Sequence, residues 1–477
     1  MRPHQQVDRD GNPLRRPKRT DHLSSLLSNT LHDVLKRHQC YGGGYGAGDG
    51  TYDPVALMRA NENAFVAVII QYRLGAFGFL SSREVHKRGV SNAGLLDQRF
   101  AFEWVQKNIN LFGGDVDAVT ISGHSAGGGS VMLHAIAYDG KDPEKLFTNL
   151  LPSSPYLPQQ YHYDGSMPTD FYNRFVQATG CAGQPDIFGC LVGKDTATLQ
   201  KANYEVTESA SALEAAARRE ATQWQTAADK RKNKDADILR TTANDHNSQS
   251  TANEGPFFTP HDITTNAGFV NYIHTLLPLF NQDMITRALQ VYDPRESTGV
   301  TTPFSTTGTS PPTALYVSDF AVGPQQQAYN LNAEVTFSCI AYWLAEAFSG
   351  SGRTSWKYEY SIPPAFHAAD LFGNGWLFDP TQNIPADFAR LFRQSWGNFI
   401  IHNNPGWKPY SPRQPVMQNF NVTGGFAVRN YTIDDLVAAQ AYGDVTPDIK
   451  LVDAYNWEGG RGKRCEFWRQ NADAIPA

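Results

Sequence analysis

A serine set between small residues constrains the fold of this chain more than any other feature. Residues 118–130 read AVTISGHSAGGGS, in which Gly123, Ser125 and Gly127 form a GxSxG pattern after an apolar, β-branched run. Small residues on both sides of a serine let a strand turn sharply into a helix and raise the hydroxyl above the sheet edge. The flanking runs VTI and SVMLHAIA are typical of a strand and a helix. Ser125 is therefore the predicted nucleophile, against the alternative of a chance match in an ordinary strand-to-helix loop.

A glycine-rich run upstream of this serine is the candidate oxyanion hole. Residues 41–50 read YGGGYGAGDG. A serine that attacks a carbonyl needs preformed N–H donors for the developing oxyanion, and glycines let backbone N–H groups approach closely. The predicted donors are Gly43, Gly44 and Ala126, the residue after the nucleophile. Without Ser125 as context, the same glycines would indicate a flexible surface loop.

Further runs carry a long, ordered pattern along the chain. They are QYRLGAFGFL (71–80), NAGLLDQRFAFEWVQKNINLFGGD (92–115), GHSAGGGS, SSPYLP (153–158), NEGPFF (253–258), PPAFHAADLFG (363–373) and EGGRGKRCEFWR (458–469). Together these runs resemble the type-B carboxylesterase family, which includes lipases and cholinesterases, and the last two resemble fungal members. The resemblance covers most of the chain from about residue 41. It implies an α/β-hydrolase fold, in which a mostly parallel central sheet is flanked by helices and carries large loop and helical insertions.

The family resemblance also implies a catalytic triad in the order Ser, Glu, His. Glu254 lies in NEGPFF, where the family places the acid that orients the histidine, and outside this motif it would read as a solvated loop carboxylate. His367 lies in AFHAAD, after the strand-like run SWKYEYSI, and is the predicted base. Asp370 matches a recurrent acidic position and is expected to support the loop. Other histidines, including His124, fall in no matching motif and are expected to be structural or exposed.

These residues predict a carboxylic ester hydrolase that works through an acyl-enzyme. The base takes the proton from the serine as the hydroxyl attacks the ester carbonyl, and water later releases the acyl group by the same route. The mechanism calls for no metal or organic cofactor, and the expected substrate is a small-molecule or lipid ester. Two alternatives remain: a catalytically impaired or inactive member that serves as a binding module, and a peptidase or amidase. The intact Ser125, Glu254 and His367 favour the esterase.

Composition agrees with one elaborated α/β domain. The chain has 477 residues, of which 41% are hydrophobic and 18% charged, and a formal net charge of −6. The acidic balance argues against a nucleic-acid partner. No run of eighteen or more apolar residues is present, so the sequence predicts no membrane-spanning helix.

Cysteine usage favours an oxidising compartment. Cys181 and Cys190 bracket CAGQPDIFGC, which resembles a disulfide-closed loop of the family. Cys339 and Cys465 could form a second pair, which would leave Cys40 unpaired. The family resemblance implies a secreted protein, although residues 1–20 are polar and basic and lack the apolar stretch of a secretory signal.

Two segments depart from the family pattern and divide the chain into an atypical segment, 1–40, and a carboxylesterase domain, 41–477. Leu23, Leu26, Leu27, Leu31 and Leu35 recur at helical spacing, so the strand that should lead into the glycine run is expected to be missing or replaced. Residues 205–250 are charged and alanine-rich where the family has an apolar strand before the acid. A helical or disordered insert is expected there.

Overall fold

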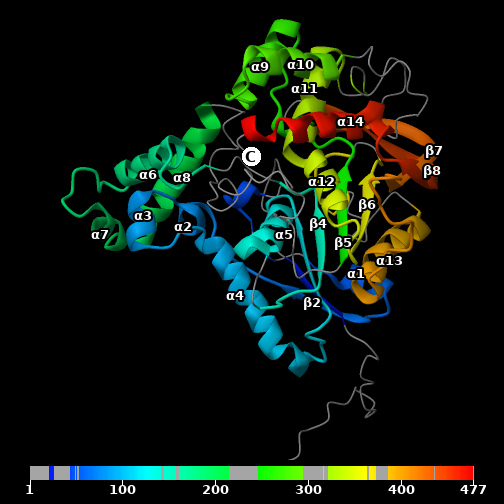
Figure 1. The fold of residues 1–477 in the computed structure, drawn as a ribbon, viewed down its shortest axis with the longest axis horizontal. Helices are drawn as coiled ribbons and strands as arrows, with labels where there is room; N and C mark the ends of the chain where they lie inside the picture. Colours follow the sequence, from blue (N-terminus) through cyan, green and yellow to red (C-terminus); the bar gives the residue numbers. More distant parts are fainter. Residues whose placement is uncertain are drawn as a thin grey trace, which may run out of the picture.

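A computed structural model gives the fold (Figure 1). It describes residues 21–25, 43–48, 50, 53–140, 144–156, 161–213, 245–293, 315, 318, 321–362, 365–371, 385–433 and 436–475. These residues form one eight-stranded sheet with helices on both faces, in the order β2-β1-β3-β4-β5-β6-β7-β8. All neighbouring strands run parallel except β7 and β8, which form an antiparallel pair. The predicted mostly parallel sheet flanked by helices is confirmed.

The strands place the chemistry of the chain at their C-terminal ends. Their bounds are β1 (Asp21–Ser25), β2 (Phe65–Ile69), β3 (Val119–His124), β4 (Asn149–Ser153), β5 (Asp245–Thr251), β6 (Thr354–Tyr360), β7 (Val416–Ile433) and β8 (Leu436–Asp453). Ser125 follows β3, Glu254 follows β5 and His367 follows β6. Since C-terminal ends of parallel strands meet at one edge of a sheet, the three residues lie at the same edge.

Helices cover both faces of the sheet. They are α1 (Val55–Ala60), α2 (Gly75–Phe79), α3 (Arg83–Arg88), α4 (Ala93–Asn108), α5 (Ala126–Ile136), α6 (Ser166–Ala178), α7 (Ile187–Val192), α8 (Thr196–Leu213), α9 (Asn266–Leu276), α10 (Gln282–Val291), α11 (Pro324–Ala333), α12 (Cys339–Ala347), α13 (Ala386–His402) and α14 (Trp457–Gln470). α5 packs on β3 and β4, and α12 packs on β5 and β6. α13 covers the opposite face and buries Phe388, Phe392, Trp396 and Phe399, whose spacing places them on one side of the helix.

The N-terminal part of the sheet corrects one sequence prediction. Helical spacing was expected from Leu23 onward, but Asp21–Ser25 form β1, which pairs in parallel with both β2 and β3. Two ladders of backbone hydrogen bonds outweigh the weak local preference of the leucine spacing. The expected gap is therefore filled by a strand of atypical, polar sequence. The rest of the leucine run and Cys40 lie outside the described residues.

The atypical segment 205–250 is helical at its start and extended at its end. α8 continues to Leu213, which agrees with the expected helix, and residues 214–244 lie outside the described part of the chain. Asp245–Thr251, however, form β5 between β4 and β6, so the expectation of an insert in place of this strand was wrong at its last residues. The strand reads DHNSQST, yet six of its seven residues are buried.

Residues of other segments pair with two of the polar side chains of β5, Ser248 and Gln249. Ser248 Oγ donates to the carbonyl of Ala341 at 2.8 Å. Gln249 Oε1 accepts from the hydroxyl of Tyr358 at 2.6 Å. These hydrogen bonds offset part of the free-energy cost of burying so polar a strand.

Two disulfides link helices. Cys181 is bonded to Cys190, which ties the end of α6 to α7 in the unit formed by α6, α7 and α8. Cys339 is bonded to Cys465, which ties α12 to α14. Both pairings agree with those considered from the sequence.

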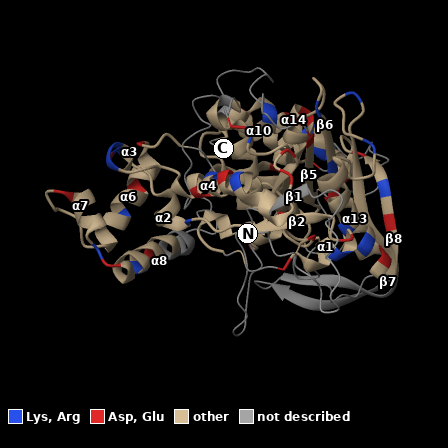
Figure 2. Cartoon of the chain, turned by 90° about the horizontal axis from the view of Figure 1, so that it is seen from below, with Lys and Arg blue, Asp and Glu red and all other residues tan. Residues whose placement is uncertain are grey.

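Charge is mixed over the surface of the described elements. Basic and acidic segments follow one another along β8 (Figure 2), where Lys450 Nζ lies 2.8 Å from Asp448 Oδ2. None of the helices within the described ranges is long and apolar enough to cross a membrane.

Candidate active site

The nucleophile candidate sits on a strained turn between β3 and α5. Ser125 has φ 55° and ψ −121°, a backbone conformation that non-glycine residues rarely adopt and that costs about 1–3 kcal/mol. A Cβ added to Gly123 would lie 2.3 Å from the backbone carbon of Gly127, so the first glycine of the motif has no room for a side chain. The N–H of Ser125 donates to Ser153 O at 2.9 Å, which ties the turn to β4. The glycines thus permit the turn that the sequence predicted.

The acid and base candidates are in direct contact. Nδ1 of His367 is hydrogen-bonded to Oε2 of Glu254, and both side chains are fully buried. The other carboxylate oxygen accepts from Ser154 Oγ and from the N–H of Thr251, each at 2.6 Å. Burial alone would raise the pKa of Glu254, but His367 and these hydrogen bonds lower it below its ordinary value. The carboxylate is therefore held ionised beside the imidazole.

The imidazole of His367 lies next to the nucleophile turn. Its ring centroid is 4.5 Å from that of His124, the residue before Ser125, and 4.4 Å from that of Phe337. Burial, reinforced by His367, holds the pKa of His124 well below its ordinary value, so His124 is neutral. Nε2 of His367 has no hydrogen-bond partner among the described residues, and no hydrogen bond joins it to Ser125. Catalytic hydrogen bonds are often long in free enzymes and tighten once substrate binds.

Phe337 belongs to an irregular part of the helix that passes the site. Residues Glu334–Ser338 form a π-helical turn between α11 and α12. Such turns insert an extra residue into a helix and occur frequently at functional sites. Here the turn supplies Phe337 to the face of the imidazole and Glu334 to a buried charged cluster near α14.

Asp370 supports the loop that carries His367. Its Oδ2 accepts from Tyr358 OH at 3.1 Å and from Ser153 Oγ at 3.2 Å. Burial, with the nearby charge of Glu254, raises the pKa of Asp370 to about 7. The loop is thereby fixed to β6 and β4, as expected from the sequence.

The glycine turn is anchored against α5 by an aromatic residue. Gly43 and Gly44 have φ 43° and 48°, and the short helical turn Gly43–Tyr45 contacts α5. Tyr45 is fully buried, with its ring 5.2 Å from that of Phe79 and 6.3 Å from that of Tyr156. Ala126 is the first residue of α5, so its N–H is among the helix N-terminal donors that lack intrahelical partners. Ala126 therefore lies at the N-terminal end of α5, and the turn with Gly43 and Gly44 contacts the same helix.

A pocket adjoins this turn at Gly46. It is lined by residues of α2, α6 and α8, and its walls include Phe79, Phe171, Phe175 and Val206. Within the described residues, no group of three or more His, Cys, Asp or Glu side chains could hold a metal ion.

Residues 39–419 match the carboxylesterase family. The chain belongs to this family. Carboxylesterase patB of Aspergillus clavatus is 30% identical over 382 residues, which cover 78% of this chain and 63% of that protein. A secreted lipase of Arthroderma benhamiae is 38% identical over 173 residues, 35% of this chain and 33% of its own. The chain thus spans less than two thirds of the length of these two relatives.

A solved structure shares the fold of this carboxylesterase-family chain. The crystal structure of Aspergillus niger EstA superposes with a TM-score of 0.63 and 20% sequence identity, and the match covers 97% of this chain and 82% of that one. The likeness supports the α/β-hydrolase fold.

Several supporting residues gave no usable signal in the sequence. Ser154 lies in SSPYLP, a run that indicated family and no role. Tyr45 is one aromatic residue in a glycine run, and Arg461 lies about two hundred residues from the turn that it contacts. A contact between distant segments has no local pattern, so only the fold reveals it.

Proposed function

We propose that this chain is a serine carboxylic ester hydrolase with Ser125 as nucleophile, His367 as general base and Glu254 as the orienting acid. The observation that carries the proposal is the buried Glu254–His367 pair, whose imidazole lies beside the residue that precedes the strained serine. Gly43, Gly44 and Ala126 are the proposed oxyanion donors. The two disulfides and the names of the secreted relatives favour an extracellular enzyme.

The chemistry follows from the roles of these groups. Nε2 of His367 accepts the hydroxyl proton as Ser125 Oγ bonds to the ester carbonyl carbon, and the carbonyl π electrons move to its oxygen. The N–H donors stabilise this oxyanion until it collapses and expels the alcohol, which takes the proton from the imidazolium. Water, deprotonated by the same imidazole, then releases the carboxylic acid. Glu254 stabilises the imidazolium in both halves.

The substrate class is a small-molecule or lipid ester. The pocket beside Gly46 has aromatic and aliphatic walls, which suit an apolar group of an ester. Turnover of p-nitrophenyl acetate and p-nitrophenyl decanoate by the purified chain tests both the activity and the chain-length preference.

A serine-reactive phosphonate identifies the nucleophile. We expect one adduct, on the peptide containing GHSAGG, and complete loss of ester turnover with it. Ser125→Ala and His367→Ala should each lower kcat by several orders of magnitude, and the double variant should lose little more, because the residues act as one unit. His402→Ala, a change at an exposed histidine on α13, is the matched control and should keep full activity. An adduct elsewhere, or multiplicative losses in the double variant, would contradict the proposal.

A further inference from the structure

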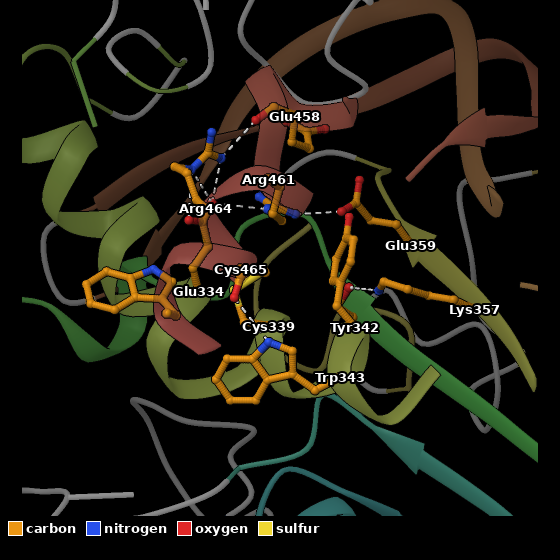
Figure 3. Close-up of a disulfide and its surroundings, with 12 residues drawn as sticks. Glu334, Cys339, Tyr342, Trp343, Lys357, Glu359, Glu458, Arg461, Arg464 and Cys465 are labelled. Atoms are coloured by element: carbon orange, nitrogen blue, oxygen red, sulfur yellow. Dashed lines mark hydrogen bonds and ion pairs between the residues drawn. A yellow bond between two sulfur atoms is a disulfide. The ribbon is translucent and has the colours of Figure 1, made fainter. Parts of the chain in front are cut away.

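A buried charged cluster lies where α14 crosses β6 and the π-helical turn (Figure 3). It consists of Glu334, Glu359, Glu458, Arg461 and Arg464, none of which is more than 3% exposed. The backbone conformation of the first residues of α14 determines how the helix packs here. Glu458, Gly459 and Gly460 have positive φ, so the chain makes a left-handed turn before the regular helix. We refer to these five residues as the α14 cluster.

Arg461 lies between two carboxylates and is hydrogen-bonded to one of them. One terminal nitrogen donates to Glu359 Oε2 at 2.5 Å, and Nε lies 3.4 Å from Glu334 Oε1. Trp457 Nε1 in turn donates to the other oxygen of Glu359 at 2.9 Å. Because a guanidinium is planar and rigid, the hydrogen bond to Glu359 and the nearby charge of Glu334 restrict the direction of the other terminal nitrogen.

The third nitrogen of Arg461 points at the turn that carries the acid. It donates to the carbonyl of Ala252 at 3.0 Å. Ala252 lies between Thr251, whose N–H donates to the Glu254 carboxylate, and Asn253, whose N–H donates to Ala365 O on the His367 loop at 3.0 Å. A displacement of this turn therefore moves both partners of the Glu254–His367 hydrogen bond.

The disulfide on α14 keeps the arginine in place. Cys465 follows Arg461 by one helical turn and is bonded to Cys339 on α12. α12 packs on β5, the strand that leads into the acid turn. The helix that presents Arg461 is thus covalently tied to the layer that covers β5.

We propose that Arg461 is a positioning residue: its guanidinium fixes the carbonyl of Ala252 and so aligns the Glu254 carboxylate with Nδ1 of His367. The inference rests on the proposed esterase function. Stability alone is a weak reason for such a cluster, because replacing buried ion pairs by apolar residues is often neutral or stabilising. A role in alignment accounts for a hydrogen bond that leaves the cluster and ends on the acid turn.

Arg464 is a matched control within the same cluster. It is 3% exposed and pairs with Glu334, with distances of 2.6 Å and 2.8 Å to the two carboxylate oxygens. Its remaining hydrogen bonds end on the carbonyls of Glu458 and Gly459 in its own helix. Its replacement removes buried hydrogen bonds to Glu334 and to the α14 backbone, and none that it makes with the acid turn itself.

The test compares Arg461→Lys with Arg464→Lys in the full chain. Lysine keeps the charge and cannot reach both carboxylates and Ala252 in the guanidinium geometry. We expect Arg461→Lys to lower kcat at least tenfold with KM within twofold, and to move the acid limb of kcat/KM to lower pH, because a misaligned Glu254 stabilises the imidazolium less. Arg464→Lys should lower Tm by a similar amount and leave both kinetic properties unchanged. The inference would be overturned if both variants lost kcat to the same extent and the loss followed the decrease in Tm.

Two further measurements test the inference even if the Arg461 variant folds poorly or the chain hydrolyses no ester. Glu359→Gln keeps the size of the side chain that binds Arg461 and should shift the acid limb of kcat/KM in the same direction by a smaller amount. An unchanged pH profile in this variant, if it folds, would contradict the positioning role. The downfield proton resonance of the Glu254–His367 hydrogen bond should move in the Arg461 variant and persist in the Arg464 variant, whether or not esters are hydrolysed. If the wild-type chain hydrolyses no ester but the resonance moves only in the Arg461 variant, the proposed function alone is wrong. If the wild-type chain is active but the resonance responds equally in both variants, only the role of Arg461 is wrong.

Discussion

Strands β3 and β5 lie on either side of β4, and each ends just before a candidate catalytic residue, yet they are built from opposite kinds of sequence. β3 leads into the sharp turn at Ser125. Gly123, Ser125 and Gly127 have no side chain or a small one, which leaves the backbone room to bend. β5 is polar throughout, and its Ser248 and Gln249 side chains are paired with groups from distant segments. One end of the site is therefore encoded locally, and the other depends on the completed fold.

The largest expected effect comes from a change in the locally encoded turn after β3. Gly123→Ala would place a Cβ 2.3 Å from the backbone of Gly127, so the turn must open and displace the Ser125 hydroxyl. A displacement of about 1 Å can cost about a hundredfold in rate, and we expect a loss of kcat/KM at least this large. Gly193→Ala is the control and should keep wild-type kinetics, because its new Cβ would lie 3.4 Å from the carbonyl oxygen of Gly189, an ordinary van der Waals contact. Wild-type turnover by Gly123→Ala would refute the close-packing account.

A second prediction tests the contacts that β5 makes with residues distant in the sequence. Tyr358→Phe removes the hydroxyl that donates to Gln249 and Asp370 and that accepts from Trp396 Nε1 at 2.9 Å. Stranding buried polar groups should cost about 1–3 kcal/mol of the free energy of unfolding, measured by urea denaturation. Tyr342→Phe should cost much less, because among the described residues the hydroxyl of Tyr342 is hydrogen-bonded to the weak acceptor Sδ of Met417 at 3.7 Å. Equal losses in the two variants would argue that pairing of β5 contributes little.

A third and smaller effect concerns pH. Asp370 has a pKa raised from 3.8 to about 7, so between these values the folded state holds a proton that the unfolded state has lost. Its contribution to stability is complete below about pH 4 and is lost as the pH rises toward 7. Asp370→Asn removes this dependence. The Tm of the variant, relative to wild type, should therefore increase from pH 4 to pH 7, and a difference that stays constant over this range would contradict the raised pKa of Asp370.

The same contrast explains how much the sequence could predict. The GxSxG turn, the glycine run and the order of Ser125, Glu254 and His367 are visible in contiguous motifs, and the family resemblance supplied the fold. β5 was misread because polarity is normally a sign of exposure, and its partners lie 93 to 109 positions away. β1 was misread because its strand pairing comes from β2 and β3, and its own residues favour no strand.

The bond between Arg461 and Ala252 joins positions 209 residues apart. During synthesis, the strand β5 and the turn that carries Glu254 leave the ribosome long before α14 does. The acid turn can form at that stage and still lack the group that holds its carbonyl. A nascent chain that already contains all three candidate catalytic residues is thus expected to hydrolyse esters poorly, and full activity to appear only after the last described α-helix has docked.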